Sequence, residues 1–162
     1  MALFLSTFIN KVDRKGRVSV PAPFRAALAG QGFPGIVAFA SFRDSYKAIE
    51  ACAMDRMERL SASLDRLNPF SDEHDDFASV LFSDAVQLPF DGEGRIILPE
   101  QLRQHAGVTD QAAFVGRGAT FQLWQPDALR AFQEQARQRA RASRADLQLE
   151  PSGGEGRGHE RR

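Results

Sequence analysis

The basic side chains of a short motif are the residues in this sequence best suited to chemistry. The motif reads Asp13-Arg14-Lys15-Gly16-Arg17. The planar guanidinium of Arg17 offers a fork of donors that matches guanine O6 and N7 or a phosphate, whereas Lys15 supplies a mobile point charge. The candidate DNA-binding residues in and around this motif are Lys11, Arg14, Lys15, Arg17 and Arg25. Basic residues clustered on one protruding turn favour contact with nucleic acid.

The chain contains this motif twice. Residues 13–25 and 91–103 align without gaps, with five identities and three further apolar matches. The identical pairs are Asp13 and Asp91, Gly16 and Gly94, Arg17 and Arg95, Pro21 and Pro99, and Arg25 and Arg103. Agreement over so many positions indicates an internal duplication. It adds Arg95 and Arg103 to the candidate DNA-binding residues.

The same local structure is predicted for both copies. Asp13 and Asp91 open a tight turn, because an aspartate carboxylate accepts hydrogen bonds from backbone N–H groups two residues further on. Gly16 and Gly94 supply a backbone position with positive φ that a side chain would resist. Apolar and polar residues then alternate, which predicts a half-buried strand, and a proline begins a short helix.

Two such Asp-x-x-Gly-Arg turns, each followed by an apolar strand, a proline and an arginine-bearing helix, closely resemble the MraZ family. The resemblance covers roughly residues 1–130. It implies two AbrB-like (SpoVT-AbrB) half-domains that interlock as a pseudo-twofold, swapped-hairpin (double-split) β-barrel, which is a mainly β, α+β fold with short helices. Such closure removes the sheet edges that one half would leave exposed.

The resemblance also implies a function. MraZ proteins are bacterial transcriptional regulators, so we expect a sequence-specific regulator that binds double-stranded DNA at short direct repeats in the promoter. It is expected to repress its own operon in the division and cell-wall gene cluster. Ring-like homo-oligomers are implied as well, and a ring that presents several turns at once gains affinity. We expect a cytoplasmic, nucleoid-associated protein with no cofactor and no enzymatic activity. We also expect no membrane segment, because no run approaches the roughly 20 apolar residues that span a bilayer.

Five parts are expected along the chain. They are a SpoVT-AbrB-like half-domain at residues 7–54, a helix and acidic linker at 55–82, a second half-domain at 83–126, a C-terminal helix at 127–144 and a disordered tail at 145–162. The tail contains a Pro-Ser-Gly-Gly-Glu-Gly run that cannot bury a core. Cys52 is the single cysteine, and we expect it to be a small buried side chain.

The duplication extends beyond the motif. Two further strands correspond, and in them Tyr46 matches Phe121 and Ile49 matches Trp124. We expect these aromatic side chains to pack in the core rather than to stack on bases. A strand is also expected at residues 3–9, and a helix follows the last strand of each copy.

The two copies differ in charge, although the whole chain has 21 basic and 21 acidic side chains and no net charge. In residues 1–30, five basic side chains oppose one aspartate, a net charge of +4. In residues 88–103, two arginines oppose three carboxylates, a net charge of −1. We therefore expect Arg17 to carry DNA recognition and Arg95 to contribute less.

Other functions fit the sequence less well than DNA binding. A protein-interaction or assembly module of the antitoxin-like type is the alternative, and the acidic second motif favours it for that copy. Residues 30–35 match the dinucleotide fingerprint Gly-x-Gly-x-x-Gly, but the match follows a helix and precedes a strand, the reverse of what that site requires. The carboxylates beside His74 are consecutive, which favours a solvated linker over a metal site. No histidine has a nucleophile at a motif position, which argues against an enzyme.

Overall fold

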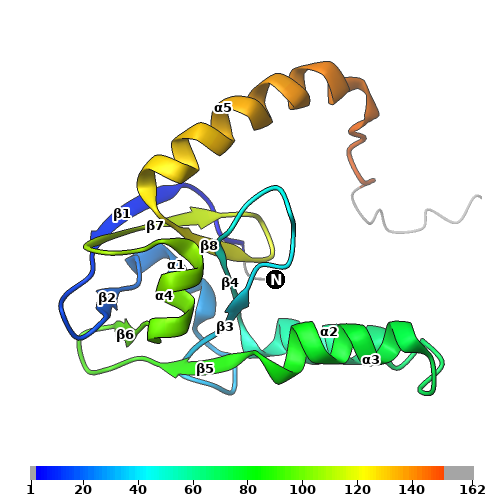
Figure 1. The fold of residues 1–162 in the computed structure, drawn as a ribbon, viewed down its shortest axis with the longest axis horizontal. Helices are drawn as coiled ribbons and strands as arrows, with labels where there is room; N and C mark the ends of the chain where they lie inside the picture. Colours follow the sequence, from blue (N-terminus) through cyan, green and yellow to red (C-terminus); the bar gives the residue numbers. More distant parts are fainter. Residues whose placement is uncertain (1–2, 152–162) are drawn as a thin grey trace, which may run out of the picture.

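Two structural units with the same order of strands and helices follow each other along the chain (Figure 1). The computed structural model describes residues 3–151, so most of the tail predicted at 145–162 lies outside the described residues. The first unit contains β1 (Thr7–Lys11), β2 (Arg17–Ser19), α1 (Ala22–Leu28), β3 (Gly35–Ala40), β4 (Ile49–Cys52) and α2 (Met54–Leu64). The second contains β5 (Val86–Pro89), β6 (Arg95–Ile97), α4 (Glu100–Ala106), β7 (Gln111–Gly116), β8 (Phe121–Trp124) and α5 (Pro126–Ser143). The connecting elements are α3 (Asp72–Ala78) and a π-helical turn, η1 (Ser79–Ser83), between the units, and a 3₁₀ turn, η2 (Arg144–Asp146), after α5.

The strands of the two units interleave in a single antiparallel sheet. Its order is β1-β7-β8-β4-β3-β5, so each outer strand pairs with a strand of the other unit. β2 and β6 pair separately as a two-stranded ribbon. When each strand is exchanged for its counterpart in the other unit, the sheet order reads the same in reverse, as a pseudo-twofold axis requires. The predicted duplication and the mainly β fold with short helices are confirmed, while closure as a double-split barrel stays a prediction.

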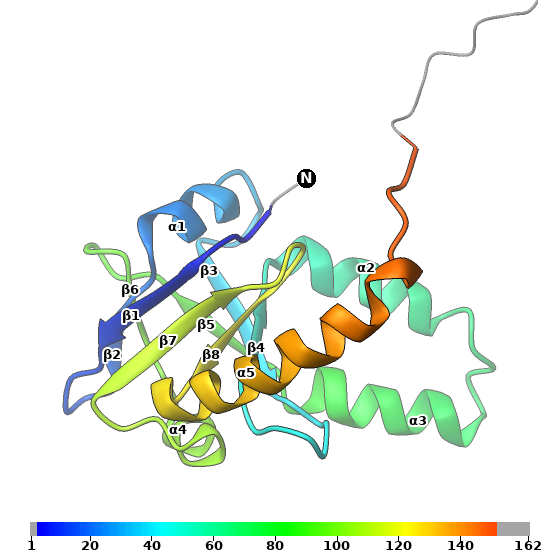
Figure 2. The ribbon, with the colours of Figure 1, turned by 90° about the horizontal axis from the view of Figure 1, so that it is seen from above.

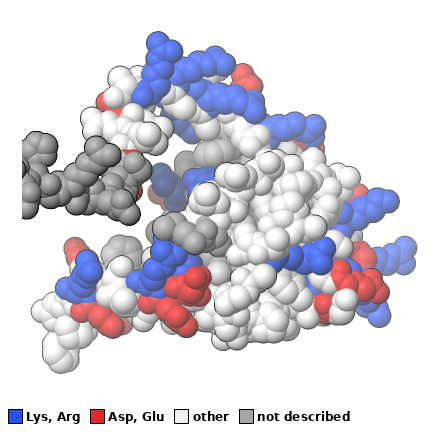
Figure 3. Space-filling model, turned by 180° about the vertical axis from the view of Figure 1, so that it is seen from behind, with Lys and Arg blue, Asp and Glu red and all other residues white. Residues whose placement is uncertain are grey.

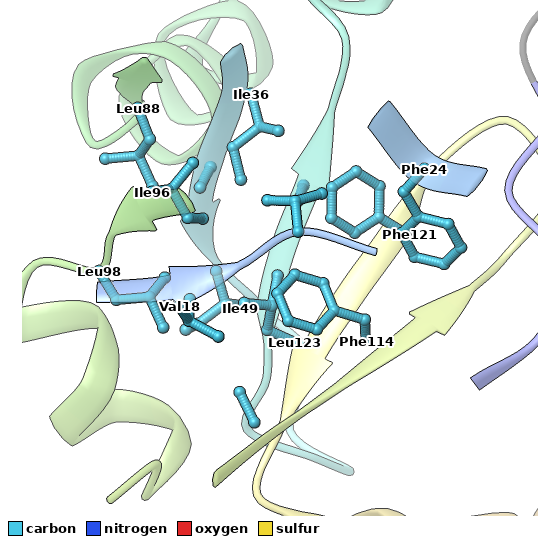
Figure 4. Packing of buried hydrophobic residues seen from close by; sticks show 14 of the residues in the cluster. Val18, Phe24, Ile36, Ile49, Leu88, Ile96, Leu98, Phe114, Phe121 and Leu123 are labelled. Carbon is cyan, nitrogen blue, oxygen red and sulfur yellow. The ribbon is translucent and has the colours of Figure 1, made fainter. Parts of the chain in front are cut away.

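Side chains from both units form the main core (Figure 4). Val18 and Ile96 lie opposite each other in the β2–β6 ribbon, and both are buried. Phe24 from α1 packs against Phe121 from β8, with ring centroids 5.0 Å apart. Because each of these contacts joins one unit to the other, the core is complete only when both units are folded.

The strand predicted at residues 3–9 is wrong in its first half. β1 begins at Thr7, and Ser6 has a φ of 74°, a left-handed conformation that interrupts an extended chain. Phe4 forms a separate bridge with Gly118, and its ring is buried. Burying a phenylalanine ring, worth about 1.5–3 kcal/mol, offsets the strain of one left-handed residue, about 1–2 kcal/mol. Burial of the Phe4 ring therefore decides the conformation here, and the alternation of residue types along 3–9 does not.

The predicted match of Tyr46 with Phe121 and of Ile49 with Trp124 is wrong by three residues. One residue separates β4 from α2, and one residue separates β8 from α5. Ile49 therefore corresponds to Phe121, and Cys52 corresponds to Trp124. The pairing of β3 with β4 and of β7 with β8 gives the same alignment. The predicted core packing of Tyr46 is nevertheless confirmed, because its ring lies 5.0 Å from that of Trp124.

The helices α2 and α3 form an arm that extends from the sheet, here called the α2–α3 arm (Figure 2). The acidic stretch that was expected as a solvated linker is helical in α3. Ser71 caps this helix by accepting a hydrogen bond from the His74 N–H, and three carboxylates in its first turn face the positive helix end. Within residues 3–151, no three His, Cys, Asp or Glu side chains are placed to hold a metal ion. Over the same range, none of the helices has the length and apolar composition needed to cross a bilayer.

The strand exchange predicts how an isolated first unit behaves. A fragment of residues 1–70 lacks β7 and β5, the partners of β1 and β3, so its edges and core stay open. We expect this fragment to show no cooperative unfolding transition as a monomer in a urea titration followed by circular dichroism. The full chain, measured in parallel, should unfold cooperatively. A sharp monomeric transition of the fragment would contradict the prediction.

Candidate nucleic-acid interface

Asp13 organises the first turn through both oxygens of its carboxylate. Oδ1 accepts from the backbone N–H groups of Lys15 and Arg17, both at 2.9 Å, and Oδ2 accepts from Arg17 Nε at 2.6 Å. Gly16 has a φ of 82°, as predicted, and its N–H donates to the Asp13 carbonyl at 3.0 Å. The turn therefore fixes the direction of the Arg17 guanidinium before any ligand binds.

The second turn repeats this geometry. Asp91 Oδ1 accepts from the N–H groups of Glu93 and Arg95 at 2.9 Å, and Oδ2 accepts from Arg95 Nε at 2.8 Å. The backbone hydrogen bond from Arg95 is the largest cause that lowers the pKa of Asp91 below its ordinary value of 3.8. The corresponding bond in the first turn lowers the pKa of Asp13 in the same way. Both carboxylates are therefore ionised near neutral pH.

The two turns lie at opposite ends of one antiparallel ribbon, because β2 and β6 pair with each other. In this ribbon Arg17 lies opposite Ile97, and Ser19 lies opposite Arg95. Both arginines line a single groove, here called the arginine groove. Its lining residues are Lys11, Val12, Asp13, Arg17, Ser19, Arg95, Asp110 and Gln111. The side-chain hydrogen bond with Asp91 is the largest cause that raises the pKa of Arg95, and the charge of Asp13, from the other copy, is the smallest. One ligand in this groove would contact both copies.

The two arginines differ in their immediate neighbours. Nε of each is bound to its own aspartate, which leaves the terminal nitrogens as outward donors. Nη1 of Arg95 lies 3.7 Å from Glu93 Oε2, whereas Lys15 occupies the position of Glu93 in the first turn. Among the described residues, the side chain of Arg17 has no hydrogen-bond partner besides Asp13. Arg17 therefore has the more electropositive surroundings of the two.

The remaining basic residues of the first copy are accessible around the groove. Arg14 and Lys15 are exposed at the tip of the first turn, and Lys11 is exposed on β1. Figure 3 shows basic and acidic side chains intermixed at the edge of the body that carries these turns, and a further run of basic side chains along α5. In this view (Figure 3) the basic side chains near the turns are interspersed with acidic ones and do not form a continuous positive face.

Arg25 and Arg103 support the turns from behind. Nε of each donates to a backbone carbonyl of its own copy at 3.1 Å. The Arg25 guanidinium lies against Gly94, where an added Cβ would come within 2.5 Å of Nη1. Arg103 contacts Gly16 reciprocally, and a Cβ there would lie 3.3 Å from its Nε. No local pattern predicts this reciprocal clamp, because only the strand exchange brings each arginine to the opposite turn. Their contact with DNA stays a prediction.

The clamp can be measured with two glycine substitutions. Gly94 and Gly107 have similar φ values of 74° and 68°, but a Cβ at Gly107 would meet no atom within 4 Å. Gly107→Ala should therefore lose only the strain of a left-handed alanine, about 1–2 kcal/mol of unfolding free energy. Gly94→Ala adds the clash with Arg25 and should lose more in a urea titration. Equal losses in the two variants would show that the Arg25 contact is dispensable.

The lowered pKa values of Asp13 and Asp91 predict acid sensitivity. Folding lowers both pKa values, so the unfolded chain binds more protons at acidic pH, and stability is lost as pH falls below about 4. The double variant Asp13→Asn/Asp91→Asn cannot titrate at these positions. Its unfolding free energy should fall less steeply between pH 5 and pH 3 than that of the unmodified chain, because two groups that take up protons on unfolding are removed. Equal pH dependence of the unfolding free energy in the two proteins would show that these aspartates do not cause the acid sensitivity.

Comparison with known proteins finds relatives of one family that match most of the chain. The family model of the MraZ protein matches residues 81–149. The transcriptional regulator MraZ of Pelagibacter ubique (strain HTCC1062) is 47% identical over 148 residues, which cover 91% of this chain and 94% of the relative. The proteins of the same name from Rickettsia bellii (strain OSU 85-389) and Rickettsia canadensis (strain McKiel) are 47% and 44% identical, and each match covers 91% of this chain and 97% of the relative. The chain therefore belongs to the MraZ family.

Proposed function

We propose that this protein is a DNA-binding transcriptional regulator that holds double-stranded DNA at the arginine groove. The observation that carries the proposal is the arrangement of Arg17 and Arg95, which come from two copies of one motif and line one groove. The names of the relatives, which are transcriptional regulators, support the regulatory part. The contact with DNA is inferred from the chemistry of the groove.

The β2–β6 ribbon and its turns have a form that DNA can accept. The major groove of B-DNA admits a two-stranded β-ribbon, and an arginine with free terminal nitrogens can donate to guanine O6 and N7. Asp13 and Asp91 each fix the Nε of their arginine, so the guanidinium is oriented before binding. This orientation reduces the loss of side-chain freedom on binding, which favours affinity.

The two copies would contribute unequally. Arg17, with Arg14 and Lys15 beside it, would form the main base and phosphate contacts, and Lys11 would reach the adjacent backbone. Arg95 would contribute less, because Glu93 forms an ion pair with one of its terminal nitrogens and repels phosphate. Arg25 and Arg103 would contribute mainly by holding the turns in place.

One groove reaches only a few base pairs, so high affinity requires several copies. We propose a homo-oligomer of ring-like form that engages short direct repeats, because linked sites raise the effective concentration of each turn near the next repeat. Bound at the promoter of its own operon, in the division and cell-wall gene cluster, such an assembly would block transcription. The protein would act in the cytoplasm, at the nucleoid.

Replacing Arg17 tests this proposal most directly. Arg17→Ala removes one fork of donors and should weaken binding to DNA from upstream of the protein's own gene by about 1–3 kcal/mol per engaged subunit, if the fork reads a base. Competition binding against a scrambled duplex of equal length measures the loss. Arg130→Ala is a matched control, because Arg130 also pairs with a nearby aspartate, Asp127, but lies on α5.

The salt dependence separates base contact from phosphate contact. If Arg17 touches phosphate alone, affinity falls equally for both duplexes and the salt slope shrinks by about one per engaged subunit. Unchanged affinity in an Arg17→Ala oligomer of normal mass would refute its role, and a larger loss from Arg95→Ala would reverse the roles of the copies. If the unmodified protein binds no DNA even at low salt, the assembly module becomes the better description.

A further inference from the structure

An apolar pocket lies between the sheet and the helical elements α2 and η1. Its volume is about 230 Å³, and Phe39, Leu60 and Leu81 form part of its wall. Phe42 and Arg43, from the loop between β3 and β4, stand at its rim, and Phe42 remains 55% exposed. A pocket of this kind, with a large exposed aromatic ring beside it, is typical of a site that receives another apolar group.

The pseudo-twofold axis explains why this pocket is open. The equivalent place in the second half is filled by the indole of Trp124, which packs against Phe132 with ring centroids 5.0 Å apart. In the first half Cys52 stands in place of Trp124, and Leu60 stands in place of Phe132. Both replacements are smaller, so the first half lacks the apolar volume that the second half supplies from its own chain.

A buried donor in the same pocket has no acceptor. Arg56 lines the pocket, and its Nε is buried without a hydrogen-bond partner among the described residues. A buried donor left unpaired is costly, and a guanidinium pairs best with a carboxylate. Arg43 adds a second positive charge at the rim, and the one carboxylate in the lining, Glu50, already accepts from Gln122 Nε2 at 2.7 Å. The ligand that suits this pocket is therefore an apolar side chain with a carboxylate close to it in sequence.

The segment that follows α5 has this chemistry. Residues 146–150 read Asp-Leu-Gln-Leu-Glu, so two leucines are flanked by two carboxylates. Leu147 is 86% exposed and Leu149 is 98% exposed, and neither packs in the pocket of its own chain. α5 carries this segment away from the sheet, on the opposite side from the α2–α3 arm (Figure 1). Both the apolar groups and the charges of the segment are thus available to another molecule.

We propose that residues 146–150 of one copy dock into this apolar pocket of a second copy of this chain. A leucine fills the volume left by Cys52, and the flanking carboxylates pair with Arg43 and Arg56. The contact is head to tail, because the two surfaces are different, and such contacts repeat from copy to copy and form a ring when the rotation between copies closes. The inference rests on the homo-oligomer of the proposed function and gives its interface, and it is independent of the contact with DNA.

Two variants remove the two sides of this contact without touching the core. The segment variant is Leu147→Ala/Leu149→Ala, and the pocket variant is Phe42→Ala/Arg43→Glu; all four side chains are exposed. Native mass spectrometry of the full chain should show oligomers for the unmodified protein and single chains for each variant. Phe70→Ala is the control, because Phe70 is 94% exposed and lies outside the pocket, and it should keep the unmodified mass.

Mixing the two variants separates docking between chains from docking within one chain. The mixture contains one intact pocket and one intact segment, so a contact between chains should give species of two chains and no larger ones. Single chains only in the mixture, or a monomeric unmodified protein, would overturn the proposal, as would variants that keep the unmodified mass. Arg17→Ala should keep its oligomeric mass whether or not it binds DNA. Loss of DNA binding can therefore be distinguished from loss of the contact between chains.

Discussion

The exchange of strands between the two halves is the constraint on which the rest of the structure depends. β1 pairs with β7 and β5 pairs with β3, so neither half can satisfy its own backbone hydrogen-bonding groups. The same exchange places β2 beside β6 and brings Arg17 and Arg95 to one groove. Fold and candidate site therefore have one origin. A change that loosened the exchange would expose sheet edges and separate Arg17 from Arg95 at the same time.

The turns are coupled across the pseudo-twofold axis through the reciprocal contacts of Arg25 and Arg103. Each glycine serves two purposes, because it adopts a positive φ and also leaves room for an arginine from the other half. The carbonyl of Gly16 accepts from the Leu98 N–H at 2.8 Å, which adds a backbone link to the clamp. Several residues that are identical in the two copies thus have a geometric task in the turn.

Local chemistry was predictable from the sequence, and long-range pairing was not. The Asp–Gly–Arg turns follow from properties of residues within five positions of each other, and their hydrogen bonds agree with the prediction. The start of β1 was missed because alternation carries no information on the core's need for Phe4. The strand match failed because Cys52 stands where aromatic character was sought. The shared groove was missed because it depends on β2 pairing with β6, which no local pattern encodes.

Duplication within one chain allows the two halves to keep one backbone plan and to differ in chemistry. A dimer of identical half-chains would present the same turn twice and could not distinguish the two directions along a duplex, so it would suit palindromic sites. Here Lys15 of the first turn corresponds to Glu93 of the second, and the open pocket beside Cys52 corresponds to a place that Trp124 fills in the second half. Direct repeats have a direction, and a head-to-tail contact has a direction. Both require an asymmetric subunit, so under the proposed function the divergence of the two copies would let one ring read repeats that all point the same way.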